Sequence, residues 1–276
     1  MQQVSESLAG RLSLVELHPF CLGEIEVGLL DRLWLCGGFP DGGILGTDTM
    51  PDWQQSYLTL LAQRDLPQWG FPAKPQMTER LFRMLAAVHG GVWNASSIAK
   101  SLGISYQTVN SYLDYLEGAY LVRRLHPYFS NTKKRLVKGS KVYWRDTGLL
   151  HSLLGVSSME QLLVQPWVGA SWESFVVEQV VSTLHAMGAN VQPYFFRTSD
   201  RYEIDLILDA GSERWAIEVK LTSAPSAGDM QRLGKVGDMV GASRRILVSR
   251  TSEMVEEGNA YSVNTARLLD LLSVWE

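Results

Sequence analysis

The segment EIDLILDAGSERWAIEVK, residues 203–220, constrains the fold of this chain more than any other segment. Two largely apolar stretches flank a short polar loop at 210–213, which predicts an antiparallel β-hairpin. The expected register gives three cross-strand pairs: Asp209 with Arg214, Asp205 with Glu218, and Glu203 with Lys220. Because side chains alternate along a strand, one face of the hairpin is expected to carry Glu203, Asp205, Ile207, Ala216, Glu218 and Lys220.

Two carboxylates directly across an antiparallel pair repel each other. In strands this apolar, Asp205 and Glu218 therefore need a cation between them or a proton on one of them. Two carboxylates and water suit Mg²⁺ or Mn²⁺, and Lys220 on the same face could orient an attacking water. The pattern predicts metal-assisted phosphodiester hydrolysis. The alternative is a simple Glu203–Lys220 ion pair with Glu218 solvated on an open face.

The rest of the chain divides into three expected regions. Helical spacing at 52–66 precedes a proline-rich linker, and residues 1–76 form the first region. Residues 77–155 contain three helical patterns and two strands, the order of a winged helix-turn-helix. Within them, Asn94 and Ser105 are expected as N-caps, and Gly103 as a helix end. Residues 166–276 alternate helices with strands and predict an α/β domain.

A strongly basic segment falls on the expected wing. Residues 120–145 carry eight cations and no acid, whereas the whole chain has a net charge of −4. Such segregation favours a phosphate-binding surface, and we expect DNA as the partner. The alternatives are a protein-contact surface or a merely solvated face. The expected nucleic-acid-binding residues, including two from the recognition helix, are Gln107, Asn110, Arg123, Arg124, Lys133, Lys134, Arg135, Lys138, Lys141 and Arg145.

Several classes of site have no support in the sequence. The five histidines have no metal-ligand spacing relative to one another or to cysteine, so no zinc site is expected. No phosphate-binding G-x-x-x-x-G-K-[ST] loop occurs, so no ATP site is expected. Two cysteines, no apolar run of about 20 residues and no signal-peptide pattern favour a soluble cytoplasmic protein.

The acidic hairpin, together with a glutamate on the preceding helix, resembles the core of the PD-(D/E)XK phosphodiesterase superfamily. The match comprises Asp205, then Glu218-Val219-Lys220 on the next strand, and Glu173. The resemblance implies that Glu173, Asp205 and Glu218 hold Mg²⁺ or Mn²⁺ and that Lys220 is catalytic. Here Ile204 stands where the family has proline. Many domains with this fold only bind, so the resemblance leaves catalysis open.

The order of segments is also similar to the C-terminal two-thirds of predicted archaeal-type AAA+ ATPases. The similarity rests on SESLAGR, LVELHPFCLGEI, GGFP, YLDYLEGAYLVRRLHPY, VYWRDTGLLHSLLG and WESFVVEQV, followed by the hairpin. It implies that residues 1–76 are the tail of an ATPase domain and a helical connector. A separately encoded ATPase would then be a partner. Two hypotheses follow: metal-dependent DNA cleavage, or a non-catalytic DNA- or protein-binding regulatory module with an inactive nuclease fold.

Overall fold

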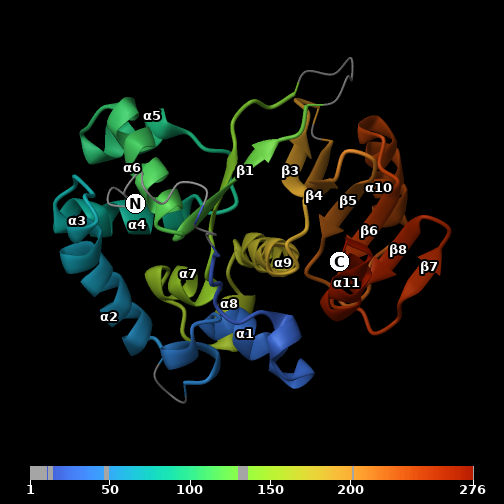
Figure 1. Cartoon of the computed structure of the whole chain (residues 1–276), viewed down its shortest axis with the longest axis horizontal. Helices are drawn as coiled ribbons and strands as arrows, with labels where there is room; N and C mark the ends of the chain where they lie inside the picture. The colour runs from blue at the N-terminus through green and yellow to red at the C-terminus, as the bar shows by residue number, and fades with distance from the viewer. Residues whose placement is uncertain (1–10, 12–14, 47–49, 130–135, 201, 276) are drawn as a thin grey trace.

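We describe a computed structural model of the chain, covering residues 11, 15–46, 50–129, 136–200 and 202–275. The protein is mixed α/β, with a helical N-terminal region followed by an eight-stranded mixed sheet and its helices (Figure 1). Within these residues, no helix is both long and apolar enough to span a bilayer.

The N-terminal helices after the first pack around a core that extends from Leu58 to Leu150. The helices are α1 (Leu30–Cys36), α2 (Asp52–Leu60), α3 (Leu66–Gln68), α4 (Pro75–Ala87), α5 (Ala95–Leu102) and α6 (Tyr106–Gly118). The predicted caps are confirmed: the Asn94 side chain accepts from Ser97 N, and Ser105 accepts from Thr108 N. Gly103 ends α5 with a φ of 71°, the left-handed conformation that glycine adopts without strain.

The sheet has the order β2-β1-β3-β4-β5-β6-β8-β7. Its strands are β1 (Val122–Pro127), β2 (Lys141–Trp144), β3 (Gln192–Arg197), β4 (Glu203–Asp209), β5 (Arg214–Val219), β6 (Arg244–Val248), β7 (Val255–Glu257) and β8 (Ala260–Val263). The sequence predicted the two strands within residues 77–155 and the hairpin at 203–220, which are β1, β2, β4 and β5. Strand β1 pairs in parallel with β3, so the β1–β2 hairpin extends the C-terminal sheet.

Helices cover both faces of this sheet. The remaining helices are α7 (Thr147–Leu153), α8 (Met159–Leu163), α9 (Val168–Ala186), α10 (Ala227–Val240) and α11 (Thr265–Leu272). Helices α9 and α11 share a core with one face, and α10 packs on the other. Helix α9 lies between the helical region and the sheet (Figure 1).

The N-terminal segment shares the core of α9 rather than forming its own. Trp34 Nε1 donates to Ser171 Oγ at 3.0 Å, and Leu22 N donates to Gln179 Oε1 at 2.6 Å. Residues from 22 to 44 and from 125 to 272 therefore contribute to one hydrophobic cluster. The cores do not follow the three regions expected from the sequence.

The β1–β2 hairpin separates the two main cores. Val122, Val142 and Trp144 pack with the N-terminal helices, whereas Leu125 and Tyr143 pack with α9. This division follows from the alternation of side chains along a strand. Because of this alternation, Lys141 and Tyr143 of β2 point toward α9, and so does Arg145 just after the strand.

The predicted β4–β5 register is confirmed over four pairs, from Asp209↔Arg214 to Leu206↔Ile217. The ladder ends one pair before Asp205 and Glu218. A β-bulge between β3 and β4 explains this end. Tyr194 pairs with Ile207 and Phe196 pairs with Ile204, so two residues of β4 lie opposite a single residue of β3. The bulge breaks the alternation, and the expectation that Ile207 shares the face of Asp205 is wrong. Ile207 packs on the α10 side, whereas the carboxylate of Asp205 lies near α9.

Candidate functional site

Four carboxylates gather at one end of strands β4 and β5, and we call them the acidic cluster. Helix α9 contributes Glu173, and the strands contribute Glu203, Asp205 and Glu218, with Lys220 just beyond β5. The sequence predicted that Glu173, Asp205, Glu218 and Lys220 would lie together, and the structure brings them together. The bulge positions Asp205, whose Oδ2 accepts a hydrogen bond from Val219 N at 2.9 Å.

A lysine from β2 lies inside the acidic cluster. Lys141 Nζ is 2.8 Å from Glu173 Oε1, 2.8 Å from Glu203 Oε1 and 3.5 Å from Asp205 Oδ1. Its side chain is 3% exposed. Burial opposes the charge, but the carboxylates, led by Glu173, raise the pKa of Lys141 well above its usual value. The site therefore contains a permanent internal cation.

The carboxylates are nevertheless not fully neutralised. Burial and the neighbouring Asp205 raise the pKa of Glu173 to about 7 and the pKa of Glu218 to about 8. Tyr143 Oη donates to Glu173 Oε1 at 2.5 Å, and Lys220 Nζ lies 2.5 Å from Glu218 Oε1. The other Glu218 oxygen, Oε2, is buried and has no hydrogen-bond partner among the described residues. The cluster thus favours protons or a further cation.

The predicted metal ligands fit a divalent ion only in part. The unpaired Glu218 Oε2 and the raised pKa values suit a missing cation. Yet among the described residues, Glu173, Asp205 and Glu218 do not offer three oxygens within 4.8 Å of one another. The Lys141 ammonium occupies the space between Glu173 and Asp205 where an ion would bind.

Of the five cations of the expected basic wing that the structure describes, four form ion pairs within the protein, which corrects the expectation that these four lie on an exposed cationic surface. Arg123, Arg145 and Lys141 point toward α9, and Arg124 pairs with Glu117 and with Asp114. Lys138 is exposed. Lys133, Lys134 and Arg135 lie outside the described residues. These pairings do not appear in a count of charges along the chain, because the carboxylate partners come from other elements, among them helices α6 and α9.

The two recognition-helix residues differ in their availability. Gln107 is exposed on α6, so its side chain is free to meet a partner. Asn110 is partly buried, and its Oδ1 accepts a hydrogen bond from Trp93 Nε1 at 2.8 Å. The side-chain oxygen of Asn110 is therefore committed to the fold.

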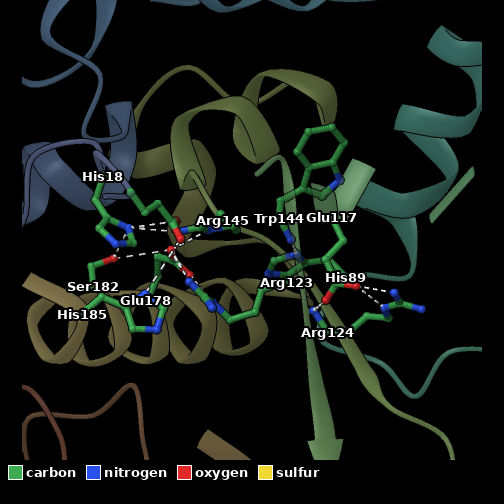
Figure 2. A network of polar contacts seen from close by, with 11 residues as sticks. His18, His89, Glu117, Arg123, Arg124, Trp144, Arg145, Glu178, Ser182 and His185 are labelled. Carbon is green, nitrogen blue, oxygen red and sulfur yellow. Dashed lines mark hydrogen bonds and ion pairs between the residues drawn. The ribbon is translucent and has the colours of Figure 1, made fainter. Parts of the chain in front are cut away.

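A second buried charge network surrounds Glu178 on α9 (Figure 2). Arg123 Nε lies 2.7 Å from Glu178 Oε2, and Arg145 Nε lies 2.7 Å from Glu178 Oε1. Burial opposes the carboxylate, but the two arginines lower the pKa of Glu178 to about 2. We call Glu178, Arg123 and Arg145 the arginine clamp.

The N-terminal segment adds Glu16 and His18 beside this clamp, where His185 of α9 also lies (Figure 2). This group could not be predicted from the sequence, because His18 and His185 are far apart in the chain. The alternation of Lys141, Tyr143 and Arg145 would have placed these three residues on one face. No pattern in the sequence pointed to His185.

Comparisons with known proteins identify two domains whose roles are not described. Residues 27–160 match the Domain of unknown function (DUF8612), and residues 168–268 match the Domain of unknown function (DUF4143). Two homologues are Uncharacterized protein Rv2008c of Mycobacterium tuberculosis and Uncharacterized protein Mb2031c of Mycobacterium bovis. Each is 38% identical over 83% of this chain and 51% of the homologue. The chain thus spans about half the length of the curated relatives it matches.

Among solved structures, the chain has a weak similarity to protein VC1899 from Vibrio cholerae. The two are 14% identical, and the match covers 81% of this chain and 55% of the other, with a TM-score of 0.27. A score this low does not establish a shared fold.

Proposed function

We propose that these two domains form a non-catalytic DNA-binding module in which a nuclease-like sheet acts as a scaffold. The observation that carries the proposal is the position of Lys141, buried among Glu173, Glu203 and Asp205. The lysine supplies the positive charge that a PD-(D/E)XK-like site takes from a metal ion. Because Lys141 belongs to the hairpin beside the helices, the same contacts fasten the helical region to the sheet.

The DNA-binding half of the proposal rests on the helices α4, α5 and α6 and the hairpin that follows them. This order is that of a winged helix, whose last helix enters the major groove. On α6, Gln107 is exposed and can reach a base edge. The exposed Lys138 and the neighbouring cations at 133–135 would contact phosphates.

Salt dependence of DNA binding tests this half directly. Four of the eight wing cations form ion pairs within the protein, so at most four remain for phosphates. Fluorescence anisotropy with a labelled duplex should give a slope of log K against log salt no steeper than about −4, instead of about −7 for eight contacts.

A matched pair of variants locates the DNA contact. Lys138→Gln should make the slope shallower by about 1, whereas Arg232→Gln, an exposed cation on helix α10 outside the winged helix, should leave it unchanged. Equal slopes for both variants, or no binding at low salt, would reject DNA and favour a protein partner. A P-loop ATPase encoded separately is the first partner to seek by copurification.

Metal-dependent phosphodiester cleavage is a second candidate, favoured by the unpaired Glu218 Oε2 and the raised pKa of Glu218. Glu173, Asp205 and Glu218 would hold Mg²⁺ or Mn²⁺, and Lys220 would steady the attacked phosphate. Linear, nicked and branched DNA incubated with either ion provides the test. Cleavage that disappears in Asp205→Asn would establish this candidate in place of the scaffold.

A further inference from the structure

The N-terminal segment carries two possible metal ligands to the C-terminal half of α9. One ligand atom each from Glu16, His18 and His185 lies within 4.8 Å of the other two. Glu16 Oε1 is 3.4 Å from His18 Nδ1, and Glu16 Oε2 is 3.9 Å from His185 Nδ1. The two imidazole rings have centroids 5.5 Å apart and are tilted by 42° (Figure 2).

These separations suit a small tetrahedral ion. Ligands about 2.0–2.1 Å from a tetrahedral zinc ion are about 3.3 Å from one another. The 3.4 Å from Glu16 Oε1 to His18 Nδ1 is close to this value, and the 3.9 Å from Glu16 Oε2 to His185 Nδ1 exceeds it by about 0.6 Å. Two imidazoles and one carboxylate form a donor set that zinc takes in proteins, with the fourth position left for water.

The state of His18 gives a second, independent indication. Its side chain is 8% exposed, and its Nε2 is buried without a hydrogen-bond partner among the described residues. Burial lowers the pKa of His18 and of His185, which favours the neutral imidazole that binds a metal.

Arg145 is the competitor for this position. One of its terminal nitrogens lies 2.5 Å from Glu16 Oε1 and 2.9 Å from His18 Nδ1. Its Nε remains held by Glu178, so an ion needs to displace only the terminal nitrogen. An adjacent cavity of about 420 Å³, bordered by Glu16, His18 and Arg145, provides a route from solvent.

We propose that Glu16, His18 and His185 form a binding site for a transition-metal dication of the zinc class. The site would clip the N-terminal segment to α9, because its ligands come from both. It is independent of the acidic cluster, whose oxygen donors suit Mg²⁺ or Mn²⁺ instead. Its occupancy does not depend on whether the chain binds DNA.

Calorimetric titration of ZnCl₂ into the full chain tests the site. The expected result is one site whose affinity falls at least tenfold in His185→Gln, because one of three protein ligands is lost. His185 is 40% exposed at the end of α9, so the substitution should preserve the fold. The matched control is His126→Gln, an exposed histidine on β1 that bonds to Ser140. It should bind zinc as the wild type does.

Co²⁺ provides a second readout, since ligation at this site should produce a visible d–d absorption band that His185→Gln and Glu16→Gln both remove. Equal zinc affinity in His185→Gln and wild type, or absence of a single stoichiometric site, would overturn the proposal. A cobalt band that persists in both variants would also overturn it, because the ion would then lie elsewhere.

Discussion

Two glutamates on helix α9, Glu173 and Glu178, are both buried against the β1–β2 hairpin, yet their surroundings shift their pKa values in opposite directions. Glu178 lies between two arginines, which lower its pKa to about 2. Glu173 shares one lysine with other carboxylates, and burial together with Asp205 raises its pKa to about 7. The difference lies in the number of cations available to each carboxylate.

The comparison separates two uses of buried charge. The arginine clamp is saturated: its carboxylate meets two guanidinium groups, and neither can lose its proton at accessible pH. The acidic cluster has more carboxylates than ammonium groups close to them, so it can exchange protons. We infer that the clamp fixes the hairpin on α9, whereas the cluster responds to pH and to cations.

The largest expected effect is the loss of the clamp's carboxylate. Glu178→Gln should reduce the free energy of unfolding by about 3–5 kcal/mol, because two buried arginines lose their counter-charge. Urea denaturation followed by circular dichroism measures this loss. Glu117→Gln is the control, since its Arg124 pair is partly exposed and should cost less than about 1 kcal/mol. Similar losses in both variants would contradict the distinction between a buried clamp and a surface pair.

Removing the internal cation of the acidic cluster should have a smaller effect that depends on pH. Lys141→Met leaves several carboxylates unpaired, but protons can replace the ammonium group. We expect a loss of about 2 kcal/mol at pH 8 that shrinks toward pH 5, as Glu173 and Glu218 protonate. Urea midpoints at both pH values provide the measurement. A loss that is the same at pH 5 and pH 8 would show that the cluster does not exchange protons.

The wild type itself should show a smaller trend of the same origin. Because the pKa of Glu218 rises from 4.5 to about 8 on folding, the folded protein holds its proton more tightly. The stabilisation that Glu218 contributes is complete below pH 4.5 and is lost as pH rises to about 8. Glu178 behaves oppositely: its contribution is present above pH 4.5 and is lost toward pH 2. Between pH 5 and 9, therefore, the acidic cluster should weaken, whereas the arginine clamp should not.

Glu218→Gln isolates this trend. The difference in unfolding free energy between wild type and variant cancels the titration of other groups, such as Asp146. From pH 5 to pH 9 that difference should shift steadily in favour of the variant. A constant difference would place the pKa of Glu218 near its ordinary value and remove the basis for a proton-exchanging cluster.

Local sequence signals predicted much of this structure. The caps at Asn94 and Ser105 and the Asp209–Arg214 register depend on residues within a few positions of one another. The bulge at Asp205 escaped prediction because it arises from pairing with β3, not from the hairpin itself. β7 is short and exposed, so it carries no apolar pattern.

The charged residues show the limit of that reasoning. The basic segment predicted a surface, but the pairing of Arg123 with Glu178 depends on a helix 55 positions away. The same holds for Lys141 and Glu173, which are 32 positions apart. Period-two alternation could have placed Lys141, Tyr143 and Arg145 on one face, yet only the packing of α9 against that face makes them internal.

Calorimetric titration of Mn²⁺ tests the central claim, that Lys141 takes the place of a metal ion in the acidic cluster. Four proteins are compared: wild type, Lys141→Met, Asp205→Asn, and Lys141→Met combined with Asp205→Asn. The account predicts little binding by the wild type, clear binding by Lys141→Met, and loss of that binding in the double variant. The account would be contradicted if the wild type bound Mn²⁺, Asp205→Asn abolished that binding and Lys141→Met left it unchanged. The acidic cluster would then be interpreted as a catalytic metal site.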